Sequence, residues 1–220
     1  MTDPLVKDQI ITYIRRNRVS TTEVADCLGK TGALSGMHAI NAGQFQVGPV
    51  SWIYTWEESN WPVHEQAENI PEDTVVVIDS FDCAGRAIFG DIVAKYMLLY
   101  RQSLALVVNG TLRDVHRLKK EGWPIWCTGY NPVGCFNRKP TSELDEALVA
   151  EHRARYEGAI AVCDDTGVVI IPPESVNEEF IGKLEFIEEQ EDIWYECIDR
   201  HKWSTFKTIC QKAYLEDGAK

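Results

Sequence analysis

The chain has 220 residues, and its formal net charge is −12 because Asp and Glu outnumber Lys and Arg by 34 to 22. Hydrophobic residues make up 45% and charged residues 25%, the composition of a folded globular protein rather than of a disordered chain. This acidity excludes a broad nucleic-acid or anionic-membrane surface, which needs clustered Lys and Arg. It still leaves room for a small anionic ligand in a locally positive cleft.

The cysteines and the N-terminus both favour a cytoplasmic location. The seven cysteines are odd in number and none has CxxC spacing, so we expect reduced thiols rather than a disulfide framework or a thiolate zinc site. The first 20 residues lack the apolar core and small-residue cleavage site of a signal peptide. No stretch approaches the roughly 18 continuous apolar residues of a membrane span.

The N-terminal part predicts two helices before the first strand. Residues 4–16 place apolar side chains at helical spacing, and Ser20 to Glu23 have the form of a capping box that opens a short second helix. Residues 30–43 are rich in glycine, so we expect a loop there. Residues 44–54 are β-rich, and Pro62 marks the start of another short helix.

The next segment predicts a βαβ unit. Residues 74–79 form a continuous apolar run of strand length, and residues 104–110 form a second one. A glycine-containing loop (80–90) and a segment of helical spacing (91–100) lie between them. This order predicts a parallel strand pair with a right-handed crossover.

The remaining elements complete a single α/β domain, which we expect to span residues 1–220. We predict a short basic helix over residues 111–121, a strand over 125–129 and a hairpin over 159–172, with helical character over 137–157. From residue 173 to 220 the apolar spacing predicts a helical C-terminal extension.

Two polar pairs follow the predicted strands of the βαβ unit. Gly90-Asp91 begins the helix after the first strand, and a helix N-terminus can receive a carboxylate or phosphate. Arg113-Asp114 follows the second strand and offers a fork for a carboxylate beside a hard oxygen ligand for a divalent cation. Ligands collect at the carboxyl ends of parallel strands, so the position favours a site. The alternatives are a plain helix cap at Asp91 and a surface ion pair or second cap at Arg113-Asp114.

Weaker candidates have structural interpretations. Asp164-Asp165 precedes a glycine and more often forms a turn than a metal site. His38 and His64 are far apart in sequence, and we expect structural roles for both. The chain contains neither a Gly-x-Ser-x-Gly elbow nor a Gly-x-Gly-x-x-Gly loop, so a serine hydrolase and a dinucleotide or methyl-donor loop of that kind have no support.

Several motifs together resemble the RraA-like family over roughly residues 20–192. That family includes regulators of ribonuclease E activity and class II aldolases of 4-hydroxy-4-methyl-2-oxoglutarate and 4-carboxy-4-hydroxy-2-oxoadipate. The motifs, in order, are Gly48-Pro49, Pro62-Val63-His64-Glu65, Val75-Val76-Val77-Ile78-Asp79, Gly90-Asp91-Ile92-Val93-Ala94, Gly110-Thr111-Leu112-Arg113-Asp114 and Asp165-Thr166-Gly167-Val168-Val169-Ile170-Ile171-Pro172. The resemblance implies a swivelling β/β/α domain with a βαβ core.

The resemblance also implies roles for individual side chains. Asp114 matches the family's ligand for Mg²⁺ or Mn²⁺, and Arg113 matches the group that holds the pyruvyl carboxylate or oxygen. Asp91 matches the carboxylate that reaches the metal through water. These roles imply a divalent metal as the cofactor and a 2-oxo acid as the substrate.

Other parts of the implied site come from the backbone and from a neighbouring subunit. The amides of Gly90, Ile92 and Val93 match the helix N-terminus that receives the substrate carboxylate. The family lends an acidic residue from the C-terminal helix of a neighbour, and Glu188 or Glu191 could fill that role here. The resemblance therefore implies a homotrimer or homohexamer.

The chain departs from the family pattern near the same motif. Asn109-Gly110 stands where the family usually has Asp-Gly, and Arg117 stands where the aldolase signature has Gly. The following acidic position falls on Gly122, with Glu121 beside it. The metal and pyruvate half of the site is thus retained, and the half that sets aldol specificity is altered.

Two hypotheses for the function follow. The first is a metal-dependent carbon–carbon lyase that passes through pyruvate enolate, acting as an aldolase or an oxaloacetate decarboxylase on a 2-oxo acid. The alternative is a non-catalytic regulator whose acidic surface engages a ribonuclease or another protein partner. Both predict neither nucleic acid nor membrane as a direct ligand.

Overall fold

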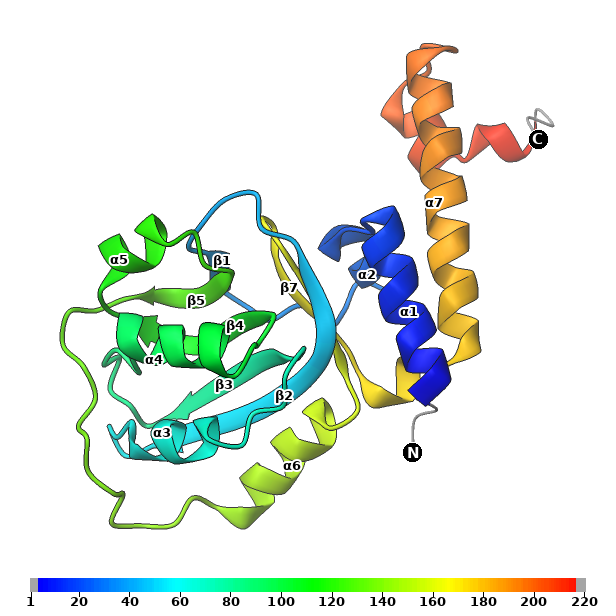
Figure 1. Cartoon of the computed structure of the whole chain (residues 1–220). Helices are drawn as coiled ribbons and strands as arrows, with labels where there is room; N and C mark the ends of the chain where they lie inside the picture. Colours follow the sequence, from blue (N-terminus) through cyan, green and yellow to red (C-terminus); the bar gives the residue numbers. More distant parts are fainter. Residues whose placement is uncertain (1–3, 217–220) are drawn as a thin grey trace.

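The computed structural model describes residues 4–216 and has an α/β architecture built on one seven-stranded sheet (Figure 1). The strand order is β1-β5-β4-β3-β2-β6-β7. Strands β2 to β5 run parallel to one another, and the others pair antiparallel. The strands are β1 (His38–Ala39), β2 (Gln46–Trp56), β3 (Val75–Phe81), β4 (Ala105–Leu112), β5 (Ile125–Tyr130), β6 (Ile160–Asp164) and β7 (Gly167–Ile171). The predicted parallel pair and the predicted hairpin are both confirmed.

The long strand β2 joins the two halves of the sheet. Its first residues, 46–49, pair antiparallel with β6, whereas residues 50–56 pair parallel with β3. Gly48 and Pro49 lie where the pairing changes. A Cβ on Gly48 would come 2.5 Å from Leu104 Cδ1, so a larger residue there would have to displace that leucine side chain. Proline removes one ladder donor and therefore suits a point at which a strand changes partners.

Helices cover both faces of the sheet. They are α1 (Pro4–Asn17), α2 (Thr21–Cys27), α3 (Trp61–Ala67), α4 (Asp91–Lys95), α5 (Val115–Lys120), α6 (Glu146–Tyr156) and α7 (Glu178–Asp199). Val76 and Ile78 pack in the core beneath α3 and α4, whereas Val75 and Val77 pack in the core that includes Tyr156 of α6. Burial on both faces explains why β3 and β4 are continuous apolar runs rather than alternating ones.

Helices α1, α2 and α7 form a third packed layer beside the hairpin of β6 and β7 (Figure 1). The predicted capping box is confirmed, because the Ser20 hydroxyl accepts from the Glu23 amide and the Glu23 carboxylate accepts from the Ser20 amide. The apolar faces of α1 and α7 meet the hairpin through Ile14, Leu184 and Val169.

Several boundaries differ from the predictions, and the loop predicted over residues 30–43 contains the short strand β1. Residues 111 and 112 extend β4, so the helix predicted from residue 111 begins only at Val115. Leu112 is fully buried and pairs with Tyr130, which holds it in the sheet. The helix that begins at residue 91 changes to π winding over Tyr96–Tyr100. Of residues 137–157, only Glu146–Tyr156 is helical, because Asp145 caps that helix through the Ala147 amide.

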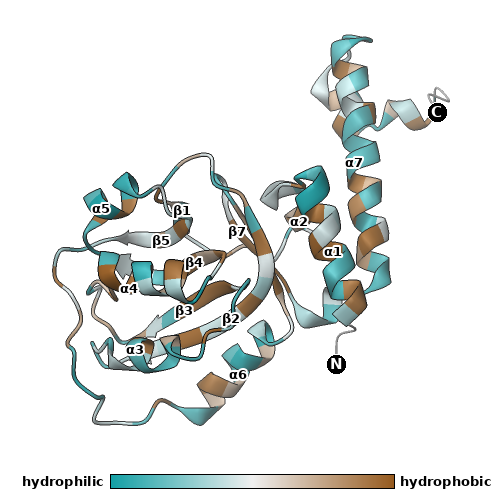
Figure 2. Cartoon of the chain, viewed as in Figure 1, coloured by the Kyte–Doolittle hydropathy of each residue, from teal (hydrophilic) through white to brown (hydrophobic). Residues whose placement is uncertain are grey.

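The described part of the extension predicted over residues 173–220 is largely helical and extends beyond the sheet (Figure 1), and residues 217–220 lie outside the described residues. Helix α7 is followed by a π turn (Phe206–Cys210) and a 3₁₀ turn (Ala213–Leu215). Apolar and polar residues alternate along α7 (Figure 2), and Phe186 and Tyr195 are exposed. Within residues 4–216, no helix is long and apolar enough to cross a lipid bilayer.

Candidate active site

The two polar pairs singled out in the sequence come together beside the carboxyl end of β4. The segment that precedes α4 runs alongside the end of β4. The Ile88 amide donates to the Thr111 carbonyl at 2.9 Å, and the Arg113 amide donates to the Phe89 carbonyl at 3.1 Å. These bonds bring Gly90 against the Arg113-Asp114 pair, as the βαβ pattern predicts.

Asp114 and Gly90 are in direct contact. A Cβ built on Gly90 would lie 2.0 Å from Asp114 Oδ2, so the carboxylate occupies space that any other residue at position 90 would fill. Asp114 itself has a left-handed backbone, with φ 57°. This region costs most L-residues roughly 1–2 kcal/mol, although aspartate adopts it more readily than most and ten other non-glycine residues of the described chain share it. The strained turn aims the carboxylate back across Gly90 instead of capping α5.

Arg113 lies over the backbone of a second glycine. A Cβ on Gly134 would come 2.5 Å from Arg113 Nη1, so the guanidinium rests on bare backbone. Two bonds fix that loop to the segment before α4: Ala87 donates to the Val133 carbonyl at 2.8 Å, and Cys135 donates to the Ala87 carbonyl at 2.9 Å. Arg113 Nε lies 3.7 Å from Asp114 Oδ2, and about half of the arginine side chain is exposed. The guanidinium therefore lies against a fixed loop and remains open to a ligand.

Asp91 forms an ion pair that the sequence did not predict. Its Oδ2 lies 2.8 Å from Arg117 Nη1. The hydrogen bond from Arg117, together with that charge and a hydrogen bond from the Ile92 amide, lowers the pKa of Asp91. The carboxylate therefore stays ionised near neutral pH, and it accepts a hydrogen bond from the Ile92 amide.

The amides at the start of α4 belong to the predicted substrate cradle. Gly90 is the N-cap, and the Ala94 amide closes the first turn onto the Gly90 carbonyl at 3.2 Å. In a helix, the amides that precede this bond have no intrahelical acceptor. The Ile92 side chain is exposed at the mouth of the site. Asp91, Ile92 and Arg117 line a groove of about 780 Å³ between α4, its π-helical continuation and α5, whereas Arg113 and Asp114 do not line it.

The donor set suits a divalent cation that keeps most of its water. Mg²⁺ commonly binds through one or two carboxylates, several waters and oxygens of the substrate. Asp114 supplies one partly exposed carboxylate, with Arg113 at a loose 3.7 Å. Residues 4–216 contain no group of three or more His, Cys, Asp or Glu side chains that could enclose a metal. The described chain therefore fits an open site at Asp114 and not a closed one.

The two acidic residues predicted to act from a neighbouring subunit both lie on α7, close to the N-terminal helices of their own chain. Glu188 accepts a hydrogen bond from the Tyr13 hydroxyl and another from Asn17 Nδ2 at 3.3 Å. Burial, reinforced by nearby Glu23 and other acids, raises the pKa of Glu191. In Figure 1 α7 lies on the opposite side of the molecule from α4 and α5, so neither glutamate reaches the candidate site of its own chain.

The pair Asp164-Asp165 has a structural role, as favoured from the sequence. Asp164 accepts from the Thr21 amide at 2.8 Å and the Thr21 hydroxyl at 2.7 Å, which ties the hairpin turn to the start of α2. Asp165 accepts from the Gly43 amide at 2.8 Å. Both carboxylates hold chain segments together.

A buried polar cluster was missed by the sequence analysis. Asp79, two residues before the end of β3, is 1% exposed. It accepts from Trp52 Nε1 at 2.9 Å and Asn109 Nδ2 at 3.2 Å, and it lies 2.7 Å from His152 Nδ1. The His152 ring stacks on Trp52 and meets the edge of Phe81. The signal was available in part, because Asp79 is the charged residue that ends an apolar run; its partner on α6 was not predictable.

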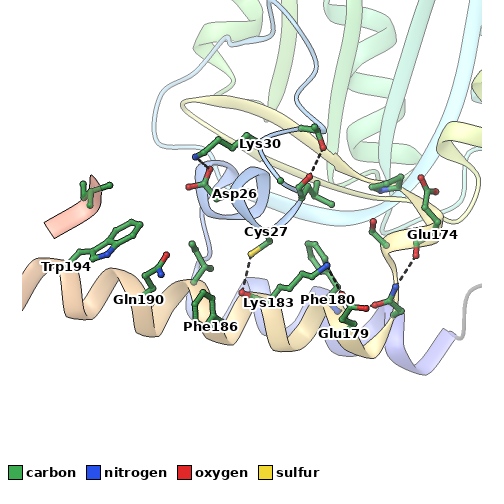
Figure 3. A pocket seen from close by; sticks show the side chains of 18 of the residues that line it. Asp26, Cys27, Lys30, Glu174, Glu179, Phe180, Lys183, Phe186, Gln190 and Trp194 are labelled. Carbon is green, nitrogen blue, oxygen red and sulfur yellow. Dashed lines mark hydrogen bonds and ion pairs between the residues drawn. The ribbon is translucent and has the colours of Figure 1, made fainter. Parts of the chain in front are cut away.

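A larger hollow of about 1080 Å³ lies between α2 and the C-terminal helices (Figure 3). Its walls carry the Lys30–Asp26 ion pair at 2.7 Å and the contact of Cys27 Sγ with the Lys183 carbonyl at 3.3 Å. None of the residues predicted for the active site lines it. Its volume alone therefore gives no reason to move the candidate site away from Asp114.

Known proteins that resemble this chain point to one family. A family model described as "RraA-like: Aldolase/RraA" matches residues 21–170. Protein DlpA of Legionella pneumophila is 26% identical over 75% of this chain, which spans only 28% of that protein's length. A putative 4-hydroxy-4-methyl-2-oxoglutarate aldolase of Halalkalibacterium halodurans is 27% identical over 74% of this chain and 77% of its own.

Solved structures share the fold. An uncharacterized protein from Pseudomonas syringae superposes with a TM-score of 0.67 at 18% identity, over 93% of this chain and 94% of its own. Streptomyces coelicolor RraAS2, described as an unusual member of the RNase ES inhibitor RraA protein family, superposes with a TM-score of 0.61 at 23% identity, over 87% of this chain and 96% of its own.

Proposed function

The chain belongs to the RraA-like family. On that premise, we propose that it is a divalent-metal-dependent lyase that cleaves or decarboxylates a 2-oxo acid through pyruvate enolate. One observation carries the proposal: an ionisable, partly exposed carboxylate, Asp114, is held in a strained turn against Gly90 and beside the open guanidinium of Arg113. A relative named as an aldolase supports the lyase class.

The chain's own residues would bind and orient the substrate. The Arg113 guanidinium presents paired N–H donors to the 2-oxo carboxylate or to the oxygen on which charge develops. Among the first amides of α4, that of Ile92 already donates to Asp91, and that of Val93 would add a donor for the substrate carboxylate. Asp114 would hold Mg²⁺ or Mn²⁺, and the bound ion supplies Lewis acidity that polarises the keto group.

The electron balance is the same for both reactions of the proposed class. In retro-aldol cleavage or in decarboxylation of oxaloacetate, the carbon–carbon bond next to the methylene breaks and its electron pair remains on the three-carbon fragment as an enolate. A proton then converts this fragment to pyruvate. Asp91 is held ionised by Arg117, so it carries no proton to give to the enolate, and a water molecule would supply that proton.

The proposed enzyme is a homo-oligomer, a trimer or a hexamer, whose neighbour completes the site. Ile92, Leu99 and Tyr100 form an exposed apolar stripe along α4 and its π-helical continuation, next to the candidate site. A stripe of large apolar side chains is typical of a subunit contact. Glu188 or Glu191 of a neighbour would bring a further carboxylate to Asp114.

The test is a coupled pyruvate assay on oxaloacetate with Mg²⁺, with and without EDTA, corrected for the metal-catalysed background without protein. We expect metal-dependent turnover that falls at least 100-fold in Arg113→Ala and in Asp114→Ala, the magnitude typical of losing one charge-stabilising group. Arg16→Ala, on the exposed surface of α1, is the matched control and should keep wild-type activity. Turnover that is absent, or unchanged in both site variants, contradicts the proposal.

The second candidate function is a non-catalytic regulator that binds another protein. The net charge of −12 favours it, because an acidic surface complements a basic partner. Two structural neighbours are described as inhibitors of ribonuclease activity or RNA processing. Affinity capture from lysate tests this function: a ribonuclease or helicase recovered at equal stoichiometry supports it, particularly if the pyruvate assay is negative.

A further inference from the structure

The Arg117–Asp91 ion pair occupies the edge of the candidate site, and the proposed function gives it no role. We infer that Arg117 competes with a divalent cation for Asp91 and thereby sets the cation affinity of the site. This inference rests on the proposed function, because it takes Asp114 as the place where the cation binds. It concerns a residue that stands where the aldolase signature has glycine.

The geometry brings the two side chains together from different helices. Asp91 is the first residue of α4, and Arg117 lies in the first turn of α5, where its amide donates to the Asp114 carbonyl at 2.8 Å. The guanidinium crosses from α5 to α4 and reaches Asp91 Oδ2 at 2.8 Å. The Asp114 carboxylate rests on Gly90, the residue just before Asp91. Arg117 is thus placed beside both acidic residues.

The charges at the site already balance. Arg113 and Arg117 contribute two positive charges, and Asp91 and Asp114 contribute two negative ones. Asp91 and Asp114 both raise the pKa of Arg117, which reports that the guanidinium feels both carboxylates. A cation arriving at Asp114 therefore meets a neutral cluster rather than two free carboxylates.

The pair can open at low cost. The Arg117 side chain is 63% exposed and that of Asp91 is 18% exposed. Exposed ion pairs of this kind contribute little to stability, so release of the guanidinium into solvent does not disturb the fold. Either Arg117 or a hydrated cation can face Asp91, and each excludes the other.

The experiment measures Mn²⁺ binding by electron paramagnetic resonance of the free ion, at fixed ionic strength and without substrate. Arg117→Gln should tighten Mn²⁺ binding about tenfold, because it removes a unit charge close to a divalent ion and frees a carboxylate. Arg117→Gln combined with Asp91→Asn should lose most of that gain. Lys120→Gln is the matched control, since it removes one charge from the same short helix; its effect should be at most twofold.

Unchanged or weaker Mn²⁺ binding in Arg117→Gln overturns the inference, as does an equal gain in Lys120→Gln. Thermal unfolding by circular dichroism should be the same for all variants, which separates a charge effect from a folding defect. Asp114→Asn tests the proposed function in the same assay: if Mn²⁺ binding is unaltered by it, the metal assignment fails. The Arg117 comparison is still decided by the gain and its loss in the double variant.

Discussion

Two aspartates near the carboxyl ends of neighbouring parallel strands have opposite environments. Asp79, two residues before the end of β3, is 1% exposed and contacts Trp52, Asn109 and His152. Asp114 follows β4, is 39% exposed and has one loose ionic contact, at 3.7 Å to Arg113.

The backbone conformations of the two aspartates also differ. Asp79 continues a regular strand in register with Asn109, whereas Asp114 lies in a left-handed turn. A buried carboxylate with every oxygen engaged stabilises its surroundings and has nothing left to offer a ligand. A strained, under-coordinated carboxylate is poised to bind. A carboxylate near the carboxyl end of a parallel strand is thus a candidate ligand-binding group. Whether its oxygens already accept hydrogen bonds decides whether it can bind a ligand.

The largest expected effect is on stability, at Asp79. Asp79→Ala should lower the free energy of unfolding by about 3–5 kcal/mol, because it leaves the buried donors of Trp52, Asn109 and His152 without their acceptor. Chemical denaturation followed by tryptophan fluorescence measures the loss. Asp8→Ala, on the exposed surface of α1, is the control and should stay within about 0.5 kcal/mol of wild type. If Asp79→Ala lowered the free energy of unfolding by less than about 1 kcal/mol, Asp79 would not have the structural role that distinguishes it from Asp114.

The converse effect is expected at Asp114. Asp114→Gly should reduce pyruvate formation at least 100-fold, while the free energy of unfolding stays within about 1 kcal/mol of wild type. Glycine accepts the left-handed backbone without strain, and this gain offsets its larger entropy loss on folding. Parallel turnover and denaturation measurements decide the matter. A large loss of stability would mean that Asp114, like Asp79, holds the fold.

A smaller effect on activity is expected when the Asp114 carboxylate is displaced rather than removed. Gly90→Ala places a methyl group where Asp114 Oδ2 lies, so we expect turnover to fall about tenfold and KM for oxaloacetate to rise, with near-native stability. Gly182→Ala is the matched control. Its added Cβ meets nothing within 4 Å, and in a helix the change should raise stability by up to about 1 kcal/mol. Equal activity in both variants would show that the contact at Gly90 does not position the carboxylate.

Sequence reasoning found the parts of the fold and site that local pattern determines. The apolar runs predicted that β3 and β4 are parallel, and from that alone Gly90 was expected beside Arg113. The capping box at Ser20 and the hairpin turn at Asp165 followed from residue type and spacing. These features depend on neighbours in the chain or on one strand pairing.

The features that were missed depend on the register of elements far apart in sequence. His152 reaches Asp79 only because α6 covers that face of the sheet, and no periodicity encodes the meeting. Gly134 lies under Arg113 because its loop pairs with Ala87. Arg117 was noted as a departure, but its contact with Asp91 follows from where α5 begins, which was predicted several residues too early.

The smallest expected effect concerns a third carboxylate, that of Glu57. It lies at the surface, as that of Asp114 does, but both of its oxygens accept hydrogen bonds, as those of Asp79 do. Glu57 accepts from the amides and hydroxyls of Thr141 and Ser142, at 2.6–3.0 Å. The bond from the Thr141 hydroxyl and those from Ser142 lower the pKa of Glu57 from 4.5 to about 2. Because the folded pKa is depressed, this stabilisation of the loop is complete above about pH 4.5 and disappears as the pH falls toward 2. The protection factors of the Thr141 and Ser142 amides against hydrogen exchange should therefore fall across this range, and Glu57→Gln should lower them already at pH 7 without moving the thermal midpoint. Protection that is unaffected by Glu57→Gln would mean that hydrogen bonding to this carboxylate does not order the loop. The number of hydrogen bonds that an exposed carboxylate accepts would then not predict its structural role.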